Sequence, residues 1–313
     1  MPRAGGSILR GGGMLSRRHM LKGMAAVLAA GAMRRVTARG ETAAEALERR
    51  FAAIEMPTGG RLGVAAWDTG SGLRAGHRAD ERFPLCSTFK VLAAGAILQR
   101  VDAGRENLAR RIRFGKDQLV DYSPVTERHA DGVGMSLGEV CAAALDYSDN
   151  TAGNLMLETL GGPLAITRFA RSLGDPVTRL DRSETSLNEA LPGDPRDTTS
   201  PQAMLRDLHA LLLGSVLRPA SRRQLLAWMT ACTTGVRRLR AGVPANWRVA
   251  DKTGSGDHGT AGDIGVLFPP GRAPVLVTVY LTQTRLSWAQ LDPVIASVGA
   301  AIAAVPAGKA AAA

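Results

Sequence analysis

The side chains best placed for covalent chemistry are Ser87 and Lys90, three positions apart at the start of a helix predicted over residues 88–101. Positions i and i+3 share one helix face, so the amine can approach the hydroxyl. A serine needs a base to become a nucleophile, and a desolvated lysine can act as that base. Taken alone, this Ser-x-x-Lys tetrad is better explained by a serine that caps the helix.

Lysine is rare in this chain, which gives each lysine more weight. Only five of the 39 basic residues are lysines, and Lys90 and Lys252 are two of the three that lie outside the terminal segments. Arginine effectively never loses its proton, whereas a buried lysine can, so a lysine in an arginine-rich chain is a candidate for proton transfer. Lys252 opens a second motif, Lys-Thr-Gly, on a predicted strand. The alternative is a polar edge strand that a lysine protects from aggregation.

A third motif, Ser148-Asp149-Asn150, stands where one predicted helix ends and the next begins. All three residue types cap helices well, so capping is the alternative to a role in catalysis. Each motif is weak by itself. The three together, in this order and in these structural contexts, are far more specific.

The periodicity of the chain predicts which elements carry these motifs. Helices are expected at 41–55, 88–101, 137–145, 151–160, 163–173, 201–213, 221–230 and 289–305, and strands at 62–67, 73–77, 247–252, 262–268 and 275–281. Strands joined by short turns pair antiparallel, so both chain ends contribute to one five-stranded antiparallel sheet. The predicted fold is α/β (α+β). Residues 41–82 and 236–305 form an α/β lobe with flanking helices, and an all-helical lobe, 83–235, is inserted between them.

These motifs resemble those of the class A serine β-lactamases, and the resemblance covers about residues 41–305. The extended-spectrum, cefotaxime-hydrolysing branch is the most similar. The resemblance implies hydrolysis of the β-lactam amide of penicillins and cephalosporins through an acyl-enzyme on Ser87, and hence antibiotic resistance. It implies that Lys90, or Glu184 through a water molecule, activates Ser87, and that Ser148 passes a proton to the departing ring nitrogen.

The segment 180–197, part of an aperiodic stretch over residues 175–198, separates this function from its alternatives. It matches the omega loop of the family, in which Glu184 activates the deacylating water and Asn188 positions it. Hydrolysis of an ester needs such a general base near the acyl carbon. Arg182 and Asp197 match the salt bridge that closes this loop. A penicillin-binding D,D-peptidase lacks the device and stays acylated. The other alternative, a non-hydrolytic β-lactam sensor, is usually tethered to a membrane helix and another domain, which this sequence is not expected to have.

The resemblance also implies a set of substrate contacts. They are Tyr122 at the entrance, Asn150 at the acylamino group, Lys252, Thr253 and Ser255 at the carboxylate, and the backbone N–H groups of Ser87 and Ser255 as oxyanion hole. Many members have an arginine after the Lys-Thr-Gly strand, where this chain has Ala261. Arg238 falls where some members place a substitute arginine, and a plain surface arginine is the equal alternative.

The three cysteines and five histidines give no cofactor signal. The family disulfides of Cys86 and Cys141 would need cysteines at the positions of Gly256 and Ala94, so the resemblance implies no disulfide. No histidine stands at zinc-ligand spacing to another His or Cys, and neither a metal nor any other cofactor is expected. The substrate is then a small molecule, and the protein is expected to be a monomer.

The net charge of +11 comes mostly from residues 1–38, which hold seven basic residues and no acidic one. The remainder has 32 basic and 28 acidic residues and no basic stripe, so nucleic acid is not an expected partner.

Paired arginines before a short apolar run indicate a signal peptide of the twin-arginine type. No run is long enough for a permanent membrane span. We expect a periplasmic or secreted bacterial protein, with a tail at 306–313.

Overall fold

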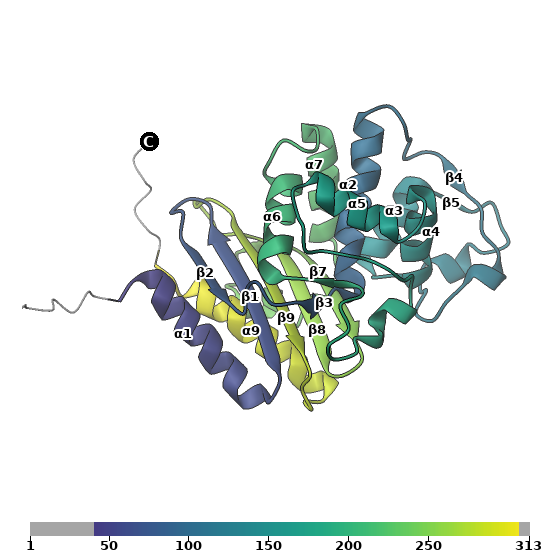
Figure 1. The fold of residues 1–313 in the computed structure, drawn as a ribbon. Coiled ribbons are helices and arrows are strands. Elements are labelled where there is room, and N and C mark those ends of the chain that lie inside the picture. Colours follow the sequence, from purple (N-terminus) through teal and green to yellow (C-terminus); the bar gives the residue numbers. More distant parts are fainter. Residues whose placement is uncertain (1–40, 307–313) are drawn as a thin grey trace, which may run out of the picture. The chain divides into compact units, whose positions relative to one another are not determined.

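A computed structural model describes residues 41–306, and the predicted signal peptide lies outside the described residues. The centre of this part is an antiparallel sheet with the order β2-β1-β9-β8-β7 (Figure 1). Its strands are β1 (Arg61–Asp68), β2 (Arg74–His77), β7 (Arg248–Gly256), β8 (Thr260–Phe268) and β9 (Val275–Thr282). The predicted five-stranded antiparallel sheet built from both ends of the chain is therefore confirmed.

Two helices from opposite ends of the sequence cover one face of the sheet, α1 (Ala43–Glu55) and α9 (Trp288–Ala303). Alternation along β9 explains why: Val277 and Val279 belong to a core shared with both helices, whereas Leu276 and Tyr280 belong to the core on the other face. A period of two places successive side chains on opposite faces, so a strand covered on both sides is apolar throughout. A capping box formed by Thr42 and Glu45 fixes the start of α1.

The helical lobe packs around α2 (Phe89–Asp102), in which residues 89–98 are all buried. A helix that is buried on every side is the centre of its cluster rather than an amphipathic cover. Around it lie α3 (Leu137–Asp146), α4 (Asn150–Leu160), α5 (Leu164–Ser172), α6 (Pro201–Leu212) and α7 (Pro219–Thr230). Helix α6 also contacts β1 and β9, so it links this lobe to the sheet.

Several short elements escape the sequence analysis. They are α8 (Leu239–Gly242), the paired strands β3 (Phe83–Pro84) with β6 (Thr198–Thr199) and β4 (Arg111–Ile112) with β5 (Met135–Ser136), and 3-10 turns at Met56–Thr58, Cys86–Thr88, Lys116–Gln118, Thr126–Arg128 and Ser186–Glu189. Two-residue strands have no period to detect. Strand β7 also runs four residues beyond the predicted end, because Thr253–Gly256 continue the pairing with β8.

Within residues 41–306, no helix is long and apolar enough to cross a membrane. The lobe boundaries proposed from the sequence, 41–82 with 236–305 and 83–235, stay a prediction. The same holds for the tail at 306–313, of which only Pro306 is described.

Candidate active site

Ser87 lies in the 3-10 turn Cys86–Thr88, which leads directly into α2. Lys90 follows in the first turn of α2, where its side chain is completely buried. The two side chains meet: Lys90 Nζ donates to Ser87 Oγ at 2.9 Å, and Ser87 Oγ donates to Glu184 Oε1 at 3.0 Å. The serine hydroxyl therefore lies between an amine and a carboxylate, either of which can take its proton.

The pocket around Lys90 is polar but shielded from solvent. Lys90 Nζ donates to the backbone oxygen of Ser148 at 2.9 Å and to Asn150 Oδ1 at 2.8 Å, and it lies 2.9 Å from Glu184 Oε1. Burial lowers the pKa of Lys90, against the opposing charge of Glu184. A Cβ at Gly153 would lie 2.7 Å from Lys90 Cε, so this glycine makes room for the lysine. Nothing in the sequence indicates this role of Gly153.

In the Ser148-Asp149-Asn150 motif, Asp149 has a structural role, whereas Ser148 and Asn150 belong to the candidate active site. Asp149 caps α4 by accepting from Ala152 N at 2.8 Å, so the capping interpretation holds for this residue. Ser148 has a left-handed backbone (φ 62°), and Asn150 Nδ2 donates to the backbone oxygen of Asp121 at 2.9 Å. Both Ser148 and Asn150 line the same cavity as Ser87.

Strand β7 supplies the opposite wall. Lys252 is fully buried and donates from Nζ to Ser148 Oγ at 2.9 Å and to the backbone oxygen of Thr253 at 2.8 Å. Burial lowers the pKa of Lys252 to about 8. Strand β7 is an edge strand of the sheet, as the alternative of an edge-protecting lysine requires, but the Lys252 amine is buried against Ser148 and presents no charge to solvent along that edge. Thr253 and Ser255 line the cavity.

The omega loop places the Glu184 carboxylate within hydrogen-bond distance of the Ser87 hydroxyl. Asn188 Nδ2 donates to Glu184 Oε2 at 2.6 Å, and Asn188 Oδ1 is buried without a protein partner among the described residues. Asn154 on α4 clamps the backbone of Glu184, donating to its oxygen at 2.9 Å and accepting from its nitrogen at 2.8 Å. Asn154 was missed because an asparagine inside a helix carries no sequence signal of its own.

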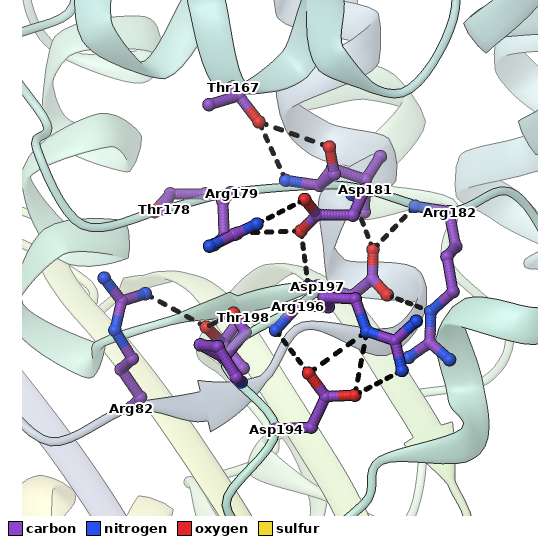
Figure 2. Close-up of polar contacts among 12 residues, drawn as sticks. Arg82, Thr167, Thr178, Arg179, Asp181, Arg182, Asp194, Arg196, Asp197 and Thr198 are labelled. Atoms are coloured by element: carbon purple, nitrogen blue, oxygen red, sulfur yellow. Dashed lines mark hydrogen bonds and ion pairs between the residues drawn. The ribbon is translucent and has the colours of Figure 1, made fainter.

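Figure 2 shows the polar contacts that close the omega loop at its base. Asp197 accepts from the backbone nitrogens of Asp181 at 2.7 Å and Arg182 at 2.9 Å, and from Arg182 Nε at 2.6 Å. The expected Arg182–Asp197 salt bridge is thus present, with the Asp197 side chain 1% exposed. A second pair, Arg196 with Asp194 at 2.7 Å, closes the adjoining turn.

Arg238 is buried (6% exposed), which contradicts the alternative of a surface arginine. Asp292 on α9 accepts from its Nε at 2.8 Å, and the backbone oxygens of Gly254 and Gly262 accept from Nη1 at 2.8 and 2.7 Å. Its Nη2 donates to Ser255 Oγ at 2.8 Å. The guanidinium is therefore fixed against β7 and lines the cavity.

One cavity of about 520 Å³ is lined by Ser87, Ser148, Asn150, Asn188, Arg238, Thr253 and Ser255. The buried side chains of Lys90, Glu184 and Lys252 are not part of this lining. Tyr122 (60% exposed) and Trp288 (58% exposed) are the large aromatic side chains in its lining. Thr234 also lines it, with Oγ1 2.5 Å from Thr253 Oγ1. Thr234 and Trp288 were not predicted from the sequence, because they lie in a loop and at a helix start without a motif.

The three cysteines, Cys86, Cys141 and Cys232, are buried free thiols. A Cβ at Gly256 would lie 2.8 Å from Cys86 Sγ, so the position is adjacent to the thiol but holds no cysteine. Among residues 41–306, no three His, Cys, Asp or Glu side chains gather as a metal site.

Comparisons with known proteins agree with this geometry. The model of the β-lactamase enzyme family matches residues 46–305. β-Lactamase CTX-M-8 of Citrobacter amalonaticus is 49% identical over 76% of this chain and 81% of its own, and β-lactamase AST-1 of Nocardia asteroides is 51% identical over 78% of each. The crystal structure of the putative class A β-lactamase PenP from Rhodopseudomonas palustris is 60% identical, with a TM-score of 0.81 over 82% of this chain and 98% of that one. The chain therefore belongs to the class A β-lactamases, hydrolases that open β-lactams and confer resistance to them.

Proposed function

We propose that Ser87 is the nucleophile of this hydrolysis. The observation that carries the proposal is the position of Ser87 Oγ, 2.9 Å from Lys90 Nζ and 3.0 Å from Glu184 Oε1. Oγ adds to the lactam carbonyl carbon, its proton passes to this pair, and the carbon–nitrogen bond of the ring then breaks. The backbone N–H groups of Ser87 and Ser255 stabilise the oxyanion, each contributing about 3–4 kcal/mol at the transition state.

Ser148 and Lys252 return the proton to the departing ring nitrogen. Lys90 Nζ contacts the backbone oxygen of Ser148, and Lys252 Nζ contacts Ser148 Oγ at 2.9 Å, so Ser148 stands between the two amines. Ser148 Oγ gives its proton to the nitrogen and regains a proton from Lys252 Nζ, and the proton that Ser87 released to Lys90 and Glu184 restores the balance of the site. The positive charge of Lys252 keeps the hydroxyl oriented and attracts the anionic substrate.

Glu184 and Asn188 promote hydrolysis of the acyl-enzyme. A water molecule held by Glu184 and by the buried Oδ1 of Asn188 attacks the ester carbonyl, Glu184 takes its proton, and Ser87 Oγ leaves with a proton restored to it. Substrates are penicillins and cephalosporins. Their carboxylate is bound by Lys252, Thr253 and Ser255, with Arg238 behind Ser255. Asn150 faces the acylamino group, and Tyr122 walls the entrance.

Several further expectations belong to this proposal. Residues 1–38 export the protein as a twin-arginine signal peptide, which places the mature enzyme in the periplasm or outside the cell. The mature enzyme acts as a monomer without a cofactor, because one chain supplies every group that the proposed reaction uses.

The experiment compares wild type, Glu184→Gln and Glu189→Gln with a chromogenic cephalosporin and with intact-protein mass spectrometry. Glu189 is the matched control, since it lies in the same loop with a half-exposed side chain. Glu184→Gln should lower turnover by about 10²–10⁴-fold and accumulate an adduct on Ser87, whereas Glu189→Gln should turn over. A wild type that stays acylated, as a D,D-peptidase or sensor would, overturns the proposal. So does a Glu184→Gln variant with normal turnover.

A further inference from the structure

Trp288 combines a large aromatic surface with an exposed position in the active-site cavity. The chain has four tryptophans. Trp288 is exposed (58%), Trp228 is buried, and Trp67 and Trp247 are partly buried. Exposing an indole forgoes a large hydrophobic contribution to folding. In a chain with only 4% aromatic residues, this points to a surface that a ligand covers.

The first residue of α9 is Trp288, and this helix also positions the carboxylate side of the cavity. Ser287 caps the helix, and Asp292, one turn after Trp288, accepts from Arg238 Nε at 2.8 Å. Positions i and i+4 share a helix face. Arg238 Nη2 in turn donates to Ser255 Oγ at 2.8 Å. The indole, the guanidinium and Ser255 therefore line the same cavity, and Asp292 ties the guanidinium beside Ser255 to the helix turn that begins with Trp288.

Cephalosporins and penicillins differ in the ring carbon next to the one that bears the substrate carboxylate. In a cephalosporin, the ring carbon that bears the carboxylate is double-bonded to C3, so the C3 substituent is its immediate neighbour. In a penicillin, the neighbouring ring carbon carries two methyl groups and no flat substituent. An indole face next to the carboxylate site therefore meets an aromatic C3 group in an offset or edge-to-face packing.

We propose that Trp288 is a specificity-determining residue that favours cephalosporins with an aromatic or heteroaromatic C3 substituent. The proposal rests on the proposed function, because that function places the carboxylate. Tyr122, the other exposed aromatic of the cavity, is assigned to the entrance instead.

The test uses two cephalosporins that share one 7-acylamino side chain and differ only at C3, a methyl group in one and a heteroarylthiomethyl group in the other. Trp288→Ala should lower kcat/KM for the heteroaryl substrate roughly two- to tenfold, mainly through KM, and leave the methyl substrate within about twofold. The ratio kcat/KM covers steps up to acylation, so later loss of the C3 group does not distort it. Trp288→Phe should retain most of the preference.

The matched control is Tyr147→Ala, an exposed aromatic (46%) outside the cavity lining, which should leave both substrates unchanged. An equal fall for both substrates in Trp288→Ala would reveal a structural role and overturn the inference. So would no change in either. Wild-type turnover of the methyl cephalosporin tests the proposed function separately. If the wild type does not turn this substrate over, the proposed function and the role of Trp288 both fail. If it does, and Trp288→Ala leaves the ratio of the two kcat/KM values unchanged, only the role of Trp288 fails.

Discussion

The two segments that meet at the Ser87 hydroxyl are held in place by different forces. Ser87 enters α2, whose residues 89–98 are all buried in the apolar core of the helical lobe. Glu184 lies in the omega loop, which is closed by the Arg182–Asp197 pair and clamped by Asn154 (Figure 2). One side of the site is positioned by hydrophobic packing, the other by charge-assisted hydrogen bonds.

This difference has a consequence for the two halves of the reaction. Apolar packing spreads its free energy over many contacts, so one truncation leaves the geometry largely intact. A buried polar network concentrates its free energy in few groups, and removing one leaves its partners unsatisfied. Acylation, for which Lys90 on α2 can take the Ser87 proton in place of Glu184, should therefore tolerate substitutions in the omega loop better than deacylation, which needs Glu184.

The largest expected effect comes from Asp197→Ala. The change removes the acceptor of two backbone N–H groups and of Arg182 Nε at a carboxylate whose side chain is 1% exposed. Breaking such a pair costs about 3–5 kcal/mol of the free energy of unfolding. Opening the base of the loop should also displace Glu184 and slow deacylation more than acylation. Acyl-enzyme should then accumulate in stopped-flow and mass-spectrometric measurements. Denaturant unfolding measures the loss of stability.

Leu92→Ala on α2 is the control with a similar loss of stability. Leu92 is fully buried, and its truncation costs about 2–5 kcal/mol. This variant should show no build-up of acyl-enzyme at temperatures where it stays folded. If both variants accumulated acyl-enzyme equally, the contrast between the two segments would be wrong.

A second aspartate, Asp207, sharpens the comparison, because its substitution is expected to raise the free energy of unfolding rather than lower it. Asp207 on α6 is 1% exposed, and neither carboxyl oxygen has a hydrogen-bond partner among the described residues. Burial, reinforced by the nearby Asp175, raises the pKa of Asp207 to about 9 from an ordinary 3.8. Between these values the folded protein keeps a proton that the unfolded chain has released, so stability falls as pH rises through this window.

Asp207→Asn removes this titration and should make the folded state more stable at pH 7 to 9. The wild type should lose at most about 1.4 kcal/mol per pH unit through the group, whereas the variant should show a shallower slope. Thermal unfolding of both proteins at pH 5, 7 and 9 measures the slopes. Parallel slopes would show that Asp207 is not the titrating group.

The sequence predicted the site better than its surroundings, for a physical reason. Ser87, Lys90 and Lys252 stand in motifs because their chemistry demands fixed residue types at fixed spacing. Gly153 and Asn154, which make room for Lys90 and clamp Glu184, act through contacts between segments that only the fold brings together. Thr234 and Trp288 reach the cavity for the same reason. The main elements were predictable from periodicity, whereas two-residue strands such as β3 and β6 are defined only by their partner.

The smallest expected effect concerns Lys252, the buried lysine on β7, the wall of the site opposite α2. Its pKa of about 8, lowered by burial, means that the amine is an ammonium below this pH and neutral above it. For a β-lactam with a free carboxylate, kcat/KM should therefore halve near pH 8 and fall up to tenfold per pH unit beyond it. Lys252→Arg keeps the charge at all these pH values. It should have a lower kcat/KM but lose the alkaline decline, and persistence of the decline in this variant would assign it to another group, such as Lys90.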